Sequence, residues 1–361
     1  MYGIHIKKAI IKEIYKKSEG IDYCIVKMEN GENVKAINYP KLSGNIKTGD
    51  NVLLNTTAVD LGLGTGGFHI IVFNIYTEHK RPDYPGHIMK LRYTPLQIRT
   101  LTVEEEDSPY REEFLEFKDL NTIPVIIIPL HSLLAPVAIV FRKFFPDKRL
   151  IYIMTEGGSL ALEMSDLIKD LQKNNYINNT ISIGHAFGGD FETINIFSGL
   201  ATAYKVAKAD LIVVGMGPGI SGTGTKYGFS GLENLFIAQA VDLLNGINIV
   251  VPRISIAEKR KRHHLISHHS LTFMELCKVK TEFVFPDLNP VKGKILEFEE
   301  TIQINNIHNV FYYKIDDIYD ILINSGFEFN SMGRSLMDDP IFFITAGLAI
   351  YRVREYLKGD E

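Results

Sequence analysis

The sequence predicts an α/β protein with a mostly parallel sheet flanked by helices, preceded by a small β-rich N-terminal domain. Before about residue 90, short strand-like runs follow one another, separated by turn signals such as Glu29-Asn30-Gly31 and lacking helical periodicity. After about residue 120, continuously apolar runs alternate with helical stretches. Strands of that kind need cover on both faces, which is typical of a parallel sheet between helices. We therefore expect a β-rich barrel- or sandwich-like domain over residues 1–90, a connector over 91–120, and an α/β domain with a helical C-terminus over 121–361.

The strands expected in the first part are closely spaced and have no helical stretch between them. They cover residues 7–15, 23–28, 33–37, 51–55 and 68–75. Short strands in such close succession favour a small barrel or sandwich. A long helix within residues 20–75 would contradict this prediction.

The second part alternates apolar strands with amphipathic helices. The expected strands are residues 125–128, 150–154, 180–183, 211–214, 247–251 and 282–285, and the expected helices are 133–145, 159–172, 191–207, 232–244, 271–277 and 341–357. Asp339-Pro340 predicts the start of the last helix, as an N-cap followed by proline at the first helical position. The apolar stretch 123–141 contains three prolines, so we expect a strand, a turn and a helix rather than a membrane span.

Composition limits the class of protein. The 361 residues carry a formal charge of −4, which argues against general nucleic-acid binding. Cys24 and Cys277 are the two cysteines, a number that fits a reducing compartment and excludes a cysteine-rich zinc module. The first residues lack the apolar core of a secretory signal, so we expect a cytoplasmic protein without membrane contact. No motif in the sequence identifies a cofactor, and the sequence is compatible with a homo-oligomer.

Glycine-rich loops follow three of the expected parallel strands. They contain Gly157 and Gly158 after the first, Gly188 and Gly189 after the second, and Gly217, Gly219, Gly222, Gly224 and Lys226 after the third. Ligands of open parallel sheets bind beyond the carboxyl ends of the strands. Glycine lets backbone N–H groups approach an anion closely, so we expect a phosphate or carboxylate ligand at this edge. Residues 217–222 match G-x-G-x-x-G but lack the context of a dinucleotide site, and residues 219–226 fail the P-loop pattern.

Ser159 follows Gly157-Gly158 between an expected strand and an expected helix. One interpretation is the nucleophile of a serine hydrolase, with Asp190 or Asp210 as the acid and a later histidine as the base. The other is that Ser159 is the N-cap of the helix.

Four of the eleven histidines lie within seven residues, at positions 263, 264, 268 and 269, directly after Lys259-Arg260-Lys261-Arg262. On a helix, His264 and His268 would share a face and could bind a metal ion. Alternatively, Ser267 starts a helix as its N-cap and leaves His263 and His264 in a loop. Anion binding, acid–base chemistry and a solvated basic surface are further interpretations. We expect residues 263–269 to border the ligand cleft, with His268 or His269 facing it, because they follow the expected strand 247–251, whose neighbour we expect to end in the longest glycine-rich loop. The acidic run 104–107 is expected to be solvated loop.

Several strings resemble one uncharacterised bacterial family, classed as a domain of unknown function. They are Asn55-Thr56-Thr57-Ala58, residues 61–67, 86–95 and 184–190, Arg253-Ile254-Ser255, His268-His269-Ser270 and Met332-Gly333-Arg334. The resemblance spans nearly the whole chain and implies no activity. It draws attention to Arg334 and to the loop 62–67.

The leading hypothesis is an enzyme, or an enzyme-like protein, that binds a small phosphorylated or nucleotide-like ligand at the carboxyl edge of the sheet. His185, Asp190, His268 and His269 are the candidates for proton transfer. Arg253 and Arg334 are the candidate charge partners of the ligand. The alternatives are the serine hydrolase and a non-catalytic module whose N-terminal domain binds a partner.

Overall fold

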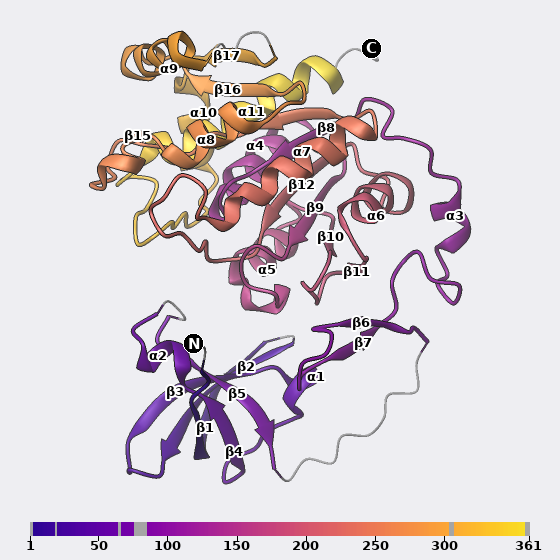
Figure 1. The fold of residues 1–361 in the computed structure, drawn as a ribbon, viewed down its shortest axis with the longest axis vertical. Helices are drawn as coiled ribbons and strands as arrows, with labels where there is room; N and C mark the ends of the chain where they lie inside the picture. The colour runs from indigo at the N-terminus through magenta and orange to yellow at the C-terminus, as the bar shows by residue number, and fades with distance from the viewer. Residues whose placement is uncertain (1–2, 19, 64–65, 76–84, 303–306, 358–361) are drawn as a thin grey trace. The chain divides into compact units, whose positions relative to one another are not determined.

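The computed structural model describes residues 3–18, 20–63, 66–75, 85–302 and 307–357 (Figure 1). The chain forms two compact units, one of residues 1–85 and 91–99 and the other of residues 86–90 and 100–361. Gly64 and Thr65, in the middle of the loop 62–67, lie outside the described residues.

The first unit is a closed five-stranded barrel, as the run of short strands predicts. Its strands are β1 (Ile6–Ser18), β2 (Ile21–Met28), β3 (Asn33–Asn38), β4 (Asn51–Asn55) and β5 (His69–Asn74). The order around the barrel is β1-β2-β3-β5-β4, and only the β3–β5 pair among these is parallel. The helices α1 (Pro40–Ser43) and α2 (Thr57–Asp60) are single turns, so no long helix interrupts the barrel. Alternate inward residues such as Ile11, Val26 and Leu54 form its core.

The second unit contains an eight-stranded, fully parallel sheet, which confirms the predicted fold class (Figure 1). Its strands are β8 (Pro124–Ile127), β9 (Leu150–Thr155), β10 (Asn179–Ser182), β11 (Phe191–Glu192), β12 (Leu211–Met216), β13 (Ile247–Val250), β16 (Glu282–Pro286) and β17 (Asn309–Tyr313). The order across the sheet is β11-β10-β9-β12-β8-β13-β16-β17. Every residue of β8, β9, β12 and β16 is buried, because helices cover both faces of these central strands.

Helices pack on the two faces of this sheet. One face carries α4 (Leu134–Phe144), α5 (Asp166–Lys173), α10 (Asp316–Asn324) and α11 (Pro340–Leu357), and the other carries α6 (Ile196–Ala201), α7 (Asn234–Leu243) and α8 (His268–Leu276) (Figure 1). Helix α9 (Asn289–Ile302) joins β16 to β17, while β6 (Ile88–Lys90), β7 (Ile98–Thr100) and α3 (Arg111–Leu115) precede the sheet in the chain. In the described part of the chain, no helix combines the length and the apolar composition that crossing a membrane requires.

The strand order corrects one expectation about the site. We expected the strand at residues 247–251 to lie beside the strand that ends in the longest glycine-rich loop. Instead β8 lies between β12 and β13 and pairs with both. The chain leaves β8 toward α4, on one face, whereas the segments after β12 and β13 lead to α7 and α8 on the other face. The loops beyond β12 and β13 can therefore meet although their strands are not neighbours.

Two local expectations were wrong. The helix expected from residue 159 begins at Asp166, and Ser165 is its N-cap, because the Ser165 hydroxyl accepts a hydrogen bond from the backbone N–H of Ile168 at 3.1 Å. Ser159 caps no helix. The acidic run 104–107 is not simply solvated, since Glu105 is buried and its carboxylate accepts hydrogen bonds from the backbone N–H groups of Thr102 (2.6 Å) and His87 (2.7 Å).

Candidate functional site

The three glycine-rich loops leave the sheet at one edge. They follow β9, β10 and β12, which are parallel and lie side by side in the order β10-β9-β12. The first and third loops also contact each other, since the backbone N–H of Ser159 donates to the carbonyl oxygen of Pro218 at 2.9 Å. The first and third loops thus line the carboxyl edge of the sheet as expected, whereas the second loop returns toward the start of β11, so that Asp190 lies beside Thr180 near the start of β10.

Most of these glycines are required by close packing of the protein on itself. A Cβ atom at Gly158 would lie 2.6 Å from the carbonyl oxygen of Gly219, and one at Gly157 would lie 2.6 Å from the carboxylate of Glu233. At Gly217 a Cβ would overlap the carbonyl oxygen of Ser159. Gly188 and Gly189 are similar, because their Cβ positions meet the Glu163 carboxylate and the Ser182 hydroxyl. The approach of backbone atoms therefore explains Gly158, Gly217 and Gly189 without a ligand, whereas the carboxylates beside Gly157 and Gly188 belong to side chains that can move, and Gly188 is favoured by its φ of +96°.

The later glycines of the third loop are different. Gly219 and Gly224 have φ angles of +92° and +79°, a conformation that favours glycine, and Gly219 has no atom within 4 Å of its Cβ position. At Gly222 the nearest atom would be 3.5 Å away, an ordinary contact. Residues 221–227 are exposed. We refer to residues 219–224 as the open glycine segment, since residue 219 and residues 221–224 are exposed. Nearby, Lys226 forms an ion pair with Glu275 of α8 at 2.5 Å.

Two expected acidic residues lie at the opposite edge. Asp190 precedes β11, and its carboxylate accepts hydrogen bonds from the backbone N–H (2.8 Å) and the hydroxyl (3.1 Å) of Thr180, near the start of β10. Asp210 precedes β12 and accepts from the backbone N–H of Arg149 at 2.7 Å. Both carboxylates therefore belong to the amino ends of their strands. The other expected proton-transfer residue of this region, His185, follows β10, and its backbone N–H donates to Glu156 at 2.7 Å.

The structure does not assemble the groups that a serine hydrolase needs. The Ser159 hydroxyl donates to the carbonyl oxygen of Ala161 at 3.4 Å, and among the described residues no imidazole lies within hydrogen-bond distance of it. Both candidate acids are at the other edge of the sheet. A nucleophile requires a base within about 3.2 Å in this kind of chemistry.

Ser267 organises the histidine-rich segment, as one of the two sequence interpretations proposed. Its hydroxyl is the N-cap of α8, accepting from the backbone N–H of His269 at 3.2 Å, and it lies 2.7 Å from Nδ1 of His263. His268 and His269 are thus the first residues of α8. His264 is exposed, with its Nδ1 3.2 Å from the carbonyl oxygen of Glu258. The expected metal pair of His264 and His268 is therefore not the group that the fold brings together.

His263, His268 and His269 instead form a compact cluster, which we call the histidine cluster. Their ring centroids are 4.3–4.9 Å apart, and one ring nitrogen from each lies within 4.8 Å of the other two. The ring of His269 stacks on Phe229 with a centroid distance of 3.8 Å and an angle of 9° between the planes. Phe229 is paired with Gly222 across the loop, and a Cβ at Gly222 would lie 3.9 Å from Nε2 of His269. The cluster therefore lies against the open glycine segment.

The imidazoles of the cluster are neutral near pH 7. Burial, followed by the positive charge of Arg253, lowers the pKa of His263 to about 3. Burial, with the neighbouring imidazoles and Arg253, lowers the pKa of His269 to about 3, and burial with Arg262 lowers that of His268. A group with so low a pKa is a weak base at neutral pH. This argues against His269 as a proton acceptor and leaves its lone pair available for other chemistry.

Four arginines lie in the region of the cluster, and they outnumber the two carboxylates that they contact. Buried Arg253 contacts Glu258 at 3.3 Å, exposed Arg260 contacts the same carboxylate at 2.7 Å, and Arg334 contacts it at 3.6 Å. The side-chain hydrogen bond from Arg260 is the main reason that the pKa of Glu258 is lowered to about 2. The fourth, Arg262, donates to Nε2 of His263 at 3.3 Å.

Asp339 completes this network from the last part of the chain. Its carboxylate lies 3.2 Å from Nε of Arg334 and accepts a hydrogen bond from the Ser255 hydroxyl. Four guanidinium groups thus face two carboxylates, a net charge of +2, beside neutral imidazoles. The basic run and Arg334 were visible in the sequence, but the sequence does not connect these two segments, because the contacts of Arg334 with Glu258 and of Ser255 with Asp339 join residues far apart in the chain.

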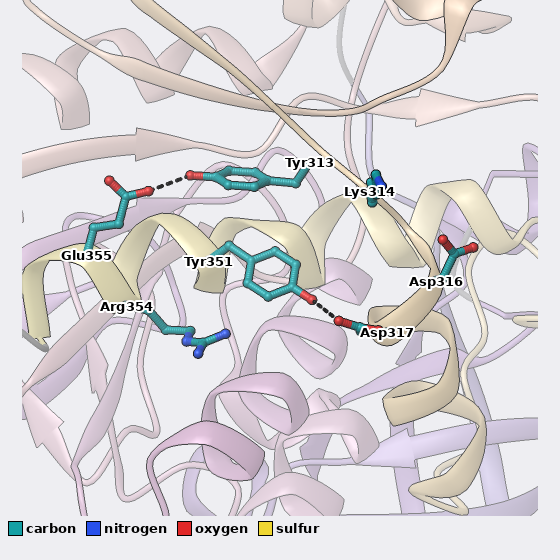
Figure 2. Close-up of a pocket in the computed structure, with 7 residues that line it drawn as sticks. All are labelled: Tyr313, Lys314, Asp316, Asp317, Tyr351, Arg354 and Glu355. Carbon is teal, nitrogen blue, oxygen red and sulfur yellow. Dashed lines mark hydrogen bonds between the residues drawn. The ribbon is translucent and has the colours of Figure 1, made fainter.

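A separate surface pocket of about 530 Å³ lies at the carboxyl end of the edge strand β17 (Figure 2). Its side chains are largely paired with one another: the Tyr313 hydroxyl donates to Glu355 at 2.8 Å and the Tyr351 hydroxyl to Asp317 at 3.3 Å. Arg354 lies over the ring of Phe144, with 4.2 Å between its guanidinium carbon and the ring centroid. The two positive and three negative side chains that line this pocket sum to −1, so it suits an anion less well than the arginine network does.

Comparison with protein families identifies the family of the chain. The family model described as "Protein of unknown function (DUF3866)" matches residues 35–350. The chain belongs to this family. The match includes the glycine-rich loops, the histidine cluster and Arg334, so the whole candidate site lies within the family domain. No curated protein matches the chain.

Proposed function

We propose that the protein binds a small anionic ligand, phosphorylated or nucleotide-like, at the carboxyl edge of the parallel sheet. The ligand would lie between the open glycine segment and the arginine network around Arg253. The excess of positive charge in that network is the observation that carries the proposal: the two buried carboxylates balance Arg253 and Arg334, and the exposed Arg260 and Arg262 add a charge of +2 that attracts anions to this surface.

Two features support the position of the ligand. Arg253 is 2% exposed, and within the described residues its Nε has no hydrogen-bond partner, so one donor of a buried guanidinium is still uncommitted. Exposed backbone at Gly219 and Gly224, both at positive φ, supplies N–H groups that a phosphate can approach without steric conflict. Arginine suits phosphate because its planar fork can donate two parallel hydrogen bonds.

This proposal is favoured over the two alternatives. The serine hydrolase lacks a base beside Ser159, as described above. The interaction module assigns function to the N-terminal barrel and stays a separate prediction, since the arginine network belongs entirely to the α/β unit. The chemistry that follows binding, if the protein is an enzyme, would involve groups that contact the anion.

Calorimetric titration of the full chain with inorganic phosphate and with ADP tests the proposal. Arg262 is exposed, so Arg262→Gln should fold normally and weaken binding about tenfold, the value of one charge-assisted hydrogen bond. Arg354→Gln, in the pocket of Figure 2, is the matched control and should bind like the wild type. The opposite pattern would place the anion in that pocket. Absence of saturable binding of either compound to the wild type would refute the proposal.

A further inference from the structure

We propose that His263, His268 and His269 form a binding site for a divalent transition-metal ion such as Zn²⁺, with one coordination position left open. This inference goes beyond anion binding and does not depend on it, since it concerns the metal ion alone. The histidine cluster lies at the start of α8, between the open glycine segment and the arginine network.

The geometry of the cluster is close to that of a three-histidine site. Zn–N bonds are about 2.0–2.1 Å long, so three nitrogens around a tetrahedral zinc ion are roughly 3.3 Å apart. The three available nitrogens lie within 4.8 Å of one another. Small rotations about the side-chain torsions would bring them to bonding distance, without movement of the backbone.

Hydrogen bonds leave a lone pair of His263 and one of His268 available to a metal ion. Arginine can only donate, so Nε2 of His263, 3.3 Å from Arg262, must be the acceptor. The proton of this ring is then on Nδ1 and is donated to the Ser267 hydroxyl at 2.7 Å. Metal-binding histidines commonly have this arrangement, in which the second nitrogen donates to a fixed acceptor. Nε2 of His268 is buried and has no hydrogen-bond partner in the described part of the chain.

The guanidinium of Arg262 lies where the metal ion would bind. It is a cation that donates to the lone pair of His263 and also lowers the pKa of His268 and His269 by its charge. Because Arg262 is exposed, its side chain can swing away when a metal ion competes for the same nitrogen. Arg262 should therefore oppose metal binding, and removing its guanidinium should raise the affinity for the metal ion. Removing a residue beside a ligand site usually has the opposite effect.

The backbone around the cluster is held from several sides. The strands β14 (Ile254–Ser255) and β15 (Leu265–Ile266) pair with each other and close the segment that contains His263. The backbone N–H of Ser267 donates to the carbonyl oxygen of Arg253 at 2.9 Å, and the stacking on Phe229 fixes the ring of His269. A site held in this way loses little conformational freedom when it binds an ion.

The ligand set selects the class of metal. Imidazole nitrogens suit Zn²⁺, Cu²⁺, Ni²⁺ and Fe²⁺, whereas Mg²⁺ and Ca²⁺ need oxygen ligands. The carboxylate of Glu258 is already engaged by Arg253 and Arg260. Three protein ligands leave a fourth position for water or an anion, the pattern of catalytic rather than structural zinc sites. The surrounding arginines would favour an anionic fourth ligand.

Titration of the metal-free full chain with Co²⁺, in a buffer without phosphate, tests the site. Tetrahedral Co²⁺ bound to nitrogen absorbs visible light strongly, and Zn²⁺ should displace it. We expect one equivalent to bind to the wild type, and His268→Gln and His269→Gln to weaken binding more than about 100-fold, since even outer partners of metal ligands are worth 10–100-fold. His264→Gln, exposed and outside the cluster, is the control and should bind normally. Circular dichroism of each variant separates loss of a ligand from loss of folding.

The direction in which Arg262→Gln changes the Co²⁺ affinity is the decisive test. It should bind Co²⁺ several-fold more tightly than the wild type, although the same variant should bind phosphate more weakly. Failure of phosphate binding with normal Co²⁺ binding would remove the anion proposal and leave the metal site intact. A wild type without a tetrahedral Co²⁺ spectrum, or a folded His268→Gln variant that binds normally, would overturn the metal site.

Discussion

Replacing Gly158 by alanine separates the packing role of the glycines at the carboxyl edge from their role in the site. In Gly158→Ala the new Cβ would lie 2.6 Å from the carbonyl oxygen of Gly219 and 2.9 Å from the carbonyl carbon of Gly217. Both are backbone atoms, so no side-chain rotation can relieve the contact. The two loops would have to move apart by roughly 1 Å to reach a normal separation.

The expected cost follows from three contributions. Overpacking costs about 1–3 kcal/mol, and the upper end applies because backbone must move. The movement also strains the hydrogen bond from Ser159 to Pro218, worth about 1 kcal/mol. Alanine also lowers the conformational entropy of the unfolded chain, which offsets about 0.4–1 kcal/mol of this loss. We expect Gly158→Ala to lower the free energy of unfolding by about 3 kcal/mol.

Urea-induced unfolding followed by far-UV circular dichroism measures this change, since the chain has no tryptophan for fluorescence. Gly222→Ala is the control: its Cβ would have 3.5 Å to the nearest atom, an ordinary contact, so the variant should not be destabilised and should gain up to about 1 kcal/mol in the free energy of unfolding. Equal stabilities of the two variants would refute the distinction between packed and open glycines.

Two further predictions concern buried groups outside the site. Burial, opposed only by the carbonyl of Met216, lowers the pKa of His131 to about 4, whereas it is about 6.5 in the unfolded chain. The unfolded state alone binds this proton between these values, so stability should fall by up to about 3 kcal/mol as the pH drops from 6.5 to 4, and His131→Gln should lose that part of the pH dependence in urea titrations. Arg352 forms two hydrogen bonds, 2.7 and 3.0 Å long, with buried Glu282. Arg352→Met should lower the free energy of unfolding by about 3–5 kcal/mol in the same assay, because the Glu282 carboxylate loses its positive partner. Adding Glu282→Leu removes that buried charge and should restore part of the lost stability. A double variant less stable than the single one would contradict this explanation.

Much of the fold was predictable because its central strands are buried on both faces. β8, β9, β12 and β16 appear in the sequence as continuous apolar runs, which few other structures require. β17 was missed because it lies at the edge of the sheet, and its first residue is exposed while the others are only partly buried. The strand order was not predictable, since apolar runs carry no record of their neighbours. That is why the separation of β12 from β13 by β8 appeared only in the structure.

The site was predictable to a smaller extent. Histidines 263, 268 and 269 were conspicuous by composition, but which of the four histidines cluster depends on Ser267, whose hydroxyl starts α8 between them. The glycine pattern was ambiguous, because glycine is required equally where a phosphate approaches and where a neighbouring loop approaches. Asp339 and Glu258 could not be assigned to the site, since the contacts that join their two segments, Arg334 with Glu258 and Ser255 with Asp339, link residues far apart in the chain.

The central position of β8 has a consequence for synthesis of the chain. β8 is the first strand of the sheet to leave the ribosome, yet its partners are residues 212–214 of β12 and 247–250 of β13. Until both have emerged, the apolar residues Val125, Ile126 and Ile127 have no strand to pair with and must be shielded by other means. The sheet can therefore assemble only after the later half of the chain has been synthesised. A truncated product that ends before β13 would expose an unpaired apolar strand edge that can pair with other chains. Chains stalled at that point are the ones in which aggregation is expected.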